Sequence, residues 1–299
     1  MKAPEHLRRG RLNIGLTVFS AITVSAVVAG TILWLHQVED KNRLEAQQAH
    51  LTELLMSETI QPALQQERAD TVSMEAGSET VQLDALPSPD QTSCEILPAY
   101  RAMFEENPDM IGWLSIDGTV IDYPVMQTPE DEDYYLDKGF DKQPNSNGCL
   151  ILGAACSAGI GTREQGYEDG SAPSTNLIIH GHTMQSGMMF GNLPLYEDHD
   201  YASEHSTICF DSLYEHREYE VIAAFYSQVY YKDQDVFKYY QFVQADTQED
   251  FDNWYDNIKA LALYDTAVTA VFGDEFITLS CCSYHVEDGR FAVVGKRIV

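Results

Sequence analysis

Residues 276–298 read FITLSCCSYHVEDGRFAVVGKRI, and this stretch carries the pattern that decides the fold. Two apolar, β-branched runs, 276–282 and 291–298, flank a polar connection that contains a glycine. Runs of this composition that are bounded by turn residues are typical of β-strands. Because the connection is short, we expect the two strands to be antiparallel neighbours, which places Arg290 near Cys282.

Further runs of the same kind indicate that the domain around this stretch is mainly β. Residues 111–116 and 119–125 flank Asp117-Gly118, a pair that is typical of a tight hairpin turn. The other apolar runs lie at 149–152, 176–180, 207–210 and 219–230. Many short strands separated by turns predict either a sandwich or a closed barrel, and periodicity alone leaves that choice open.

Two helices and one long loop are predicted among these strands. Residues 98–106 have a helical pattern that Asn107-Pro108 stops. The segment 157–175 is rich in Gly and Ser, and we expect a mobile surface loop there. A helix is predicted over residues 247–263, where aromatic and aliphatic residues recur at helical spacing: Phe251, Trp254, Tyr255, Ile258 and Leu261.

The N-terminal part of the chain has a different organisation. Residues 1–11 form a basic tail, and residues 12–35 are uncharged and reach about 36 Å as a helix, enough to cross a bilayer core of ~30 Å. The positive-inside rule keeps this tail in the cytoplasm and the rest of the chain outside. A cleaved secretory signal is the alternative, although its apolar region is usually shorter. Residues 36–94 are predicted to form a helix (36–66), either a juxtamembrane helix or a short coiled coil, and an acidic linker before a domain at 95–299.

Charge and cysteine content restrict the classes of partner and of site. The chain has 18 Lys and Arg against 47 Asp and Glu, for a net charge of −29. Because nucleic-acid binding needs clustered basic residues, this balance argues against a nucleic-acid partner. Six cysteines in an exported chain permit disulfides, but 299 residues can bury a core without them. The Cys-x2-Cys spacing of structural zinc sites is absent.

Two strand ends carry side chains that are capable of chemistry. Residues 176–184 read NLIIHGHTM, so an apolar strand ends in His180 and His182. A histidine there can face a cleft while the strand holds it, and a surface histidine at a turn is the plain alternative. The strand at 276–282 ends in Cys281 and Cys282. Since side chains alternate along a strand, only one of the two cysteines can face the same cleft, and two small buried cysteines are the alternative.

A thiol, an imidazole and a guanidinium at strand ends together form a set that can transfer acyl groups. The thiolate attacks a carbonyl carbon, and the histidine moves protons. Arg290 carries a permanent charge and can stabilise an oxyanion. Taken alone, Arg290 is better explained as a solvated side chain beside Glu287 and Asp288.

These motifs resemble those of the sortase family, most of all its class B branch. Residues 278–282 (TLSCC) are similar to the family's Thr-Leu-x-Thr-Cys, a match that makes Cys282 the nucleophile and puts Cys281 in a threonine position. Arg290 falls where the family's arginine stands. Over residues 96–299 the other similar segments are 107–114 (NPDMIGWL), 123–125 (YPV), 133–136 (DYYL), 181–184 (GHTM), 189–193 (MFGNL) and the helix at 247–263, which resembles the class B insertion.

The resemblance implies a closed eight-stranded β-barrel with an N-terminal helix and one inserted helix. It implies a membrane-anchored cysteine transpeptidase without a metal or cofactor, which cleaves a C-terminal sorting signal of secreted proteins and transfers them to a peptidoglycan or pilin amine. Cys282, His182 and Arg290 are then the catalytic residues, and Ser280 and His180 are candidate substrate contacts. His180 stands where class B members often carry a tyrosine.

Three other interpretations are compatible with the same residues. The first is a membrane-tethered metal-binding or adhesive module that uses His180, His182, Cys281 and Cys282 as ligands, since imidazole and thiolate suit zinc. The second is a hydrolytic thiol protease of the same fold. The third is a regulatory addition to the enzyme, in which Cys281 and Cys282 form a strained disulfide that switches off activity in oxidising medium.

Overall fold

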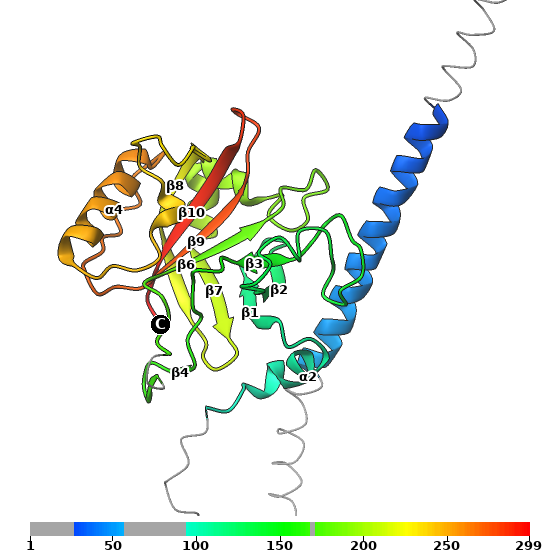
Figure 1. Ribbon diagram of the computed structural model, residues 1–299, viewed down its shortest axis with the longest axis horizontal. Coiled ribbons are helices and arrows are strands. Elements are labelled where there is room, and N and C mark those ends of the chain that lie inside the picture. The colour runs from blue at the N-terminus through cyan, green and yellow to red at the C-terminus, as the bar shows by residue number, and fades with distance from the viewer. Residues whose placement is uncertain (1–26, 57–93, 168–170) are drawn as a thin grey trace, which may run out of the picture. The chain divides into compact units, whose positions relative to one another are not determined.

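A computed structural model describes residues 27–56, 94–167 and 171–299 of the chain (Figure 1). The chain divides into two compact units, with the boundary between Ala46 and Gln47. Residues 27–56 are helical. None of the helices in the described ranges is both long and apolar enough to cross a bilayer. Most of the predicted membrane span at 12–35, and most of the predicted linker, lie outside the described residues.

Eight strands form one sheet that closes on itself, in the order β1-β2-β3-β6-β9-β10-β8-β7 (Figure 1). Closure comes from β1, which pairs antiparallel with both β2 and β7. The mainly β prediction with eight strands is therefore confirmed, and this pairing decides between the sandwich and the closed sheet. The strands are β1 (Met110–Ser115), β2 (Asp122–Met126), β3 (Leu150–Leu152), β6 (Asn176–Gly181), β7 (Thr207–Ser212), β8 (Glu218–Gln228), β9 (Phe276–Cys282) and β10 (Gly289–Arg297).

The two predicted helices of the domain are present. α2 (Pro98–Glu106) has a proline in its first turn and ends at Asn107, as expected. α4 (Gln248–Leu261) begins with a capping box, in which the Thr247 side chain accepts from the Asp250 amide and the Asp250 side chain accepts from the Thr247 amide. The short elements α3 (His199–Glu204), η1 (Leu193–Glu197) and η2 (Tyr239–Gln241) were not predicted.

The inserted helix α4 covers one outer face of the sheet. Its buried side chains Phe251, Trp254 and Ile258 belong to the same apolar cluster as Phe276 of β9 and Ala292 of β10. β9 and β10 are therefore covered on both faces, by α4 outside and by the barrel core inside. This double burial explains why the two strands are nearly continuous apolar runs in the sequence.

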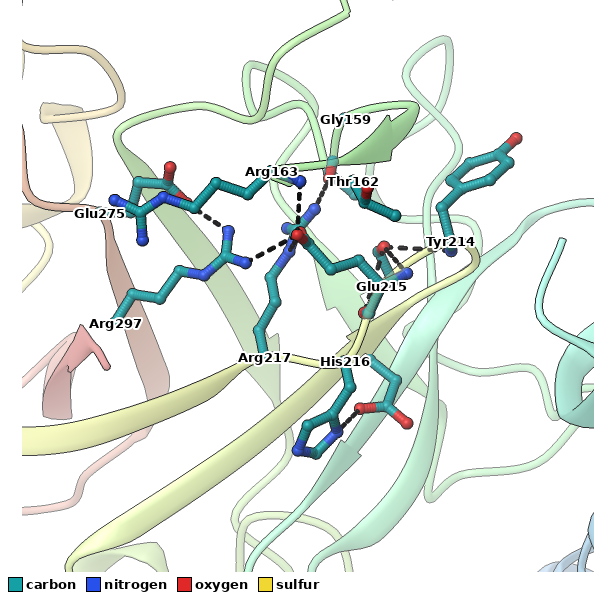
Figure 2. A network of polar contacts seen from close by, with 12 residues as sticks. Gly159, Thr162, Arg163, Tyr214, Glu215, His216, Arg217, Glu275 and Arg297 are labelled. Carbon is teal, nitrogen blue, oxygen red and sulfur yellow. Dashed lines mark hydrogen bonds and ion pairs between the residues drawn. The ribbon is translucent and has the colours of Figure 1, made fainter. Parts of the chain in front are cut away.

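A buried ionic network ties the turn between β7 and β8 to the far end of β10 (Figure 2). Glu215 accepts from Arg217 Nε at 2.8 Å and pairs with Arg297 Nη2 at 2.9 Å, while Arg297 Nη1 also reaches Glu275 at 2.7 Å. The Arg217 side chain is fully buried, and that of Arg297 is 2% exposed. Two cations and two anions thus neutralise one another inside the protein.

The same network holds the segment that we expected to be a mobile loop. Within residues 157–175 lies a short hairpin, β4 (Gly161–Thr162) with β5 (Gly166–Tyr167). The Arg163 amide donates to Glu215 at 2.6 Å, and Arg217 Nη2 donates to Ala158 O at 2.8 Å (Figure 2). The predicted surface loop therefore contains a short hairpin and fixed contacts, which the sequence did not predict because the anchors lie far away in the sequence.

Candidate active site

Cys282 and Arg290 occupy opposite positions on neighbouring strands. Cys282 ends β9, and its register partner in the antiparallel strand β10 is Arg290. Partners in a sheet project from the same face, so the thiol and the guanidinium lie on one side of the sheet. Arg290 Nη1 donates to its neighbour's carbonyl, Gly289 O, at 3.0 Å. Both side chains are only partly buried, and substrate can therefore reach them.

His182 reaches the same edge of the sheet from β6. β6 runs parallel to β9 with Gly181 opposite Cys281, so the next residue on each strand is His182 beside Cys282. The Thr183 hydroxyl donates to Cys282 O at 2.5 Å and joins the two strand ends. His182 Nε2 lies 2.7 Å from Leu136 O. Since a carbonyl can only accept, Nε2 carries the proton there and Nδ1 is the acceptor of the neutral ring.

Cys281 has an environment unlike that of Cys282. It projects from the opposite face of β9, is 2% exposed, and burial raises the pKa of its thiol to about 11. None of the six cysteines, all of which the structure describes, forms a disulfide. Because Cys281 and Cys282 project from opposite faces of an extended strand, the structure gives no support to a disulfide between them.

A pocket of about 280 Å³ lies against the face that carries Arg290. Its walls include Ile178 and His180 of β6, Tyr239 of η2, Val243 and the thiol-bearing residue Cys156. Burial lowers the pKa of His180 to about 4, and the charge of Arg290 lowers it further in the same direction. His180 is therefore a neutral ring at pH 7.

Ser280 does not line this pocket. Its side chain is 1% exposed, and its Oγ lies 2.7 Å from Tyr239 OH, which covers it. Burial raises the pKa of Tyr239 to about 12, so the phenol stays protonated. Ser280 thus lies behind Tyr239, which lines the pocket, and a direct contact of Ser280 with substrate stays a prediction.

Three of the residues that build the site had no role assigned to them from the sequence. Thr183 and Leu136 lie in segments that resemble the family, 181–184 and 133–136, but their own roles depend on contacts across the fold. Tyr239 lies in the irregular segment between β8 and α4, where no periodicity marks it. Only the strand order and the register bring these residues to the edge that carries Cys282.

The residues that the structure describes do not support the alternative of a metal centre. In the ranges that the structure describes, no three His, Cys, Asp or Glu side chains converge in a way that could hold a metal ion. Of the four proposed ligands, Cys281 points away from the face that carries His180 and Cys282.

Comparisons of the sequence and of the structure with known proteins both find similarity to sortase B proteins. No family model matches the chain. Sortase B of Listeria monocytogenes is 29% identical over 207 residues, covering 68% of this chain and 76% of that protein. Sortase B of Staphylococcus aureus is 24% identical over 205 residues, with the same coverage. The crystal structure of sortase B from B. anthracis in complex with AAEK1 superposes with a TM-score of 0.54 at 25% identity, covering 68% of this chain and 85% of that one.

The sequence matches extend over most of each relative. The domain whose sequence resembles the family's motifs also contains the closed sheet, the inserted helix and the cysteine at the end of β9. In sequence and in fold, the chain is therefore similar to the sortase B proteins, the class B members of a family of cysteine transpeptidases.

Proposed function

We propose that this protein is a membrane-anchored transpeptidase that cleaves a C-terminal sorting signal of secreted proteins and transfers them to an amine of peptidoglycan or of a pilin. Cys282 is the nucleophile, His182 the proton carrier and Arg290 the group that stabilises the oxyanion. The observation that supports this proposal is the register of β6, β9 and β10: Arg290 is opposite Cys282, and His182 follows Gly181, which is opposite Cys281. The high pKa of Cys281 favours Cys282 over its neighbour.

The first half of the reaction forms a thioester. His182 takes the thiol proton of Cys282, the resulting thiolate Sγ attacks the carbonyl carbon of the scissile peptide bond, and Arg290 holds the charge on the carbonyl oxygen. When the C–N bond breaks, the departing amine takes a proton from His182. The acyl group of the secreted protein remains on Cys282 as a thioester. The C-terminal fragment of the sorting signal leaves with a free amino terminus.

The second half transfers the acyl group. An incoming amine attacks the thioester carbon and gives up a proton to His182, while the C–S bond breaks and the thiol of Cys282 is restored. One amide bond is exchanged for another, so no oxidant or external energy source is needed. Arg290 holds the oxyanion of the second tetrahedral intermediate as it holds the first.

Anchoring in the membrane is supported by the sequence. Residues 12–35 form a long uncharged stretch and residues 1–11 are basic, a pattern that supports a catalytic domain outside the cell. The family resemblance implies the same location, on the surface of a Gram-positive cell, where sorting signals and wall amines are both present.

The test uses the full chain in detergent with quenched peptides of the forms x-Pro-x-Thr-Gly and Asn-Pro-x-Thr-Asn, with and without triglycine as the amine acceptor. We expect cleavage, a peptide–triglycine conjugate when the acceptor is present, and an acyl-enzyme mass on Cys282. The variant Cys282→Ala forms neither product. If the carboxylic acid is the sole product with and without triglycine, the protein is a hydrolytic thiol protease instead.

A further inference from the structure

The side chain of Thr183 binds the backbone of the proposed nucleophile. β6 ends at Gly181 whereas β9 continues to Cys282, so the parallel ladder between these strands stops one rung before the catalytic residues. In a parallel ladder a carbonyl accepts from the residue that follows its register partner, which for Cys282 O is residue 183. The donor found there is the Thr183 hydroxyl, 2.5 Å from Cys282 O. This side chain therefore continues the ladder beyond the last paired residue of β6.

The direction of the Cys282 carbonyl follows from the other side of β9. The Ser283 amide donates to Gly289 O of β10 at 2.9 Å, so the backbone groups of Ser283 face β10. Because these groups alternate sides along a strand, those of Cys282 face β6. Cys282 and Arg290 thus form a non-hydrogen-bonded pair of the antiparallel ladder, and the Cys282 carbonyl depends on the β6 side for its partner.

The segment that carries Thr183 is itself held in place. Thr183 pairs with Met189 in an isolated antiparallel bridge, and the Phe190 amide donates to His182 O at 3.0 Å. The Met189 amide also donates to the hydroxyl of the buried Tyr123 at 3.1 Å. The Thr183 hydroxyl therefore projects from an anchored segment and can serve as a fixed point for the end of β9.

The imidazole of the preceding residue is fixed by a separate contact. His182 Nε2 donates to Leu136 O at 2.7 Å, so one hydrogen bond sets the position of the ring and the hydroxyl of Thr183 sets that of the Cys282 backbone. Together these two contacts determine how far the thiol lies from the group that exchanges protons with it. A displacement of about 1 Å at a reacting group can cost about a hundred-fold in rate.

We propose that Thr183 is a positioning residue, whose hydroxyl holds the end of β9 so that Cys282 stays within reach of His182. This inference rests on the proposed roles of Cys282 and His182 and adds the group that fixes their separation. Valine at position 183 keeps the branched shape and loses the hydroxyl, whereas serine keeps the hydroxyl and loses a methyl group. The two substitutions therefore separate the hydrogen bond from the packing.

The first test measures cleavage of the same quenched peptides by the full chain in detergent. Thr183→Val lowers kcat about ten- to a hundred-fold and leaves KM within about two-fold, because Thr183 acts on the nucleophile and not on bound substrate. Thr183→Ser restores kcat to within about three-fold of wild type. The control Thr266→Val removes a half-buried hydroxyl that also donates to a strand carbonyl, Ile222 O at 3.3 Å, and leaves kcat as in wild type. An unchanged kcat in Thr183→Val, or an equal loss in both Thr183 variants, overturns the proposal.

The second test needs no sorting signal and uses 4-nitrophenyl acetate. His182 takes the thiol proton, Cys282 Sγ attacks the acetyl carbon and 4-nitrophenolate leaves, so a burst of nitrophenolate reports acylation alone. The burst amplitude counts chains with a competent thiol, and the rate constant of the burst depends on where that thiol lies. Cys282→Ala gives no burst, which assigns the signal to Cys282.

Thr183→Val lowers the rate constant of this burst about ten-fold at an unchanged amplitude, whereas a loss of folding lowers the amplitude. A rate constant equal to that of wild type contradicts the proposal. If wild type gives the burst but neither cleaves nor transfers any peptide, the transpeptidase function fails, and the ratio of the two rate constants still decides the role of Thr183.

Discussion

Arg290 lies directly opposite Cys282 in the register of β9 and β10, and the two residues are joined by the ladder of the sheet as well as by the turn between them. The distance between thiol and guanidinium is thus set by two of the most deeply buried strands of the protein. A site built on strand ends holds its geometry better than one built on loops.

The two adjacent cysteines are expected to differ completely in function. Cys282→Ala should lower kcat/KM for peptide cleavage by at least about a thousand-fold, because it removes the nucleophile. The matched variant Cys281→Thr replaces a buried side chain on the opposite face and should keep activity within about ten-fold. Full activity in Cys282→Ala would show that the register of the catalytic residues is different.

Alkylation by iodoacetamide should separate the same two thiols by rate. With a pKa of about 11, only about one in three thousand Cys281 side chains is a thiolate at pH 7.5, and the residue is buried as well. The partly exposed Cys282 should therefore react at least about a hundred-fold faster. Mass spectrometry of Cys281→Thr and Cys282→Ala over time assigns the fast site, and a fast phase that survives in Cys282→Ala contradicts this order.

Replacement of the arginine should affect the chemical step. Arg290→Gln removes the charge opposite Cys282 and should reduce kcat by about 10² to 10³-fold, in the range found for the loss of one oxyanion donor. Arg290→Lys keeps the charge but not the planar fork and should recover only part of the rate. The exposed Arg101→Gln on α2 serves as the control. Equal rates for Arg290→Gln and wild type would remove Arg290 from the mechanism.

Stability should depend on pH through His180. Burial, with a contribution from Arg290, lowers its folded pKa to about 4, below the unfolded value of about 6.5. The unfolded chain therefore binds the proton first as pH falls, and stability that is complete above about pH 6.5 is lost towards pH 4. Wild type should lose up to about 3 kcal/mol more than His180→Gln between pH 7 and 4. Denaturant titrations at several pH values measure this difference, and parallel curves would contradict it.

The buried network of Figure 2 should be sensitive to the loss of one charge. Burial raises the pKa of Glu215, but hydrogen bonds from the Arg163 amide and the side chains of Arg297 and Arg217 outweigh it and lower the pKa overall. Glu215→Gln leaves two buried arginines with one carboxylate fewer and should cost about 3–5 kcal/mol of unfolding free energy. Glu204→Gln, at an exposed position, should cost less than about 0.5 kcal/mol. Chemical denaturation of both variants provides the comparison.

The elements around the site could be predicted because each has a local cause. The apolar run at 276–282 coincides with β9, and the helical pattern at 247–263 encloses α4. Burial on both faces makes a strand continuously apolar, and an amphipathic face makes a helix periodic, so both patterns are visible within one segment.

The remaining features depend on pairs that are distant in the sequence. Alternation shows that Cys281 and Cys282 face opposite ways, but only the register shows which of them shares a face of the sheet with Arg290. The cover that Tyr239 places over Ser280 joins residues 41 positions apart. The pairing of Arg217 and Arg297 with Glu215 likewise has no local pattern, and for this reason the sequence of residues 157–175 predicts only a surface loop.

The position of β10 has a consequence for the assembly of the protein. β10 follows β9 along the chain, yet it lies between β9 and β8 in the sheet. Until β10 is in place, β8 and β9 each present a long apolar edge whose amide and carbonyl groups have no partner, and such edges pair with other chains. A chain interrupted before Gly289 therefore lacks Arg290 and also exposes the unpaired edges of two strands, β8 and β9. Inactivity and aggregation of such fragments would share a single origin.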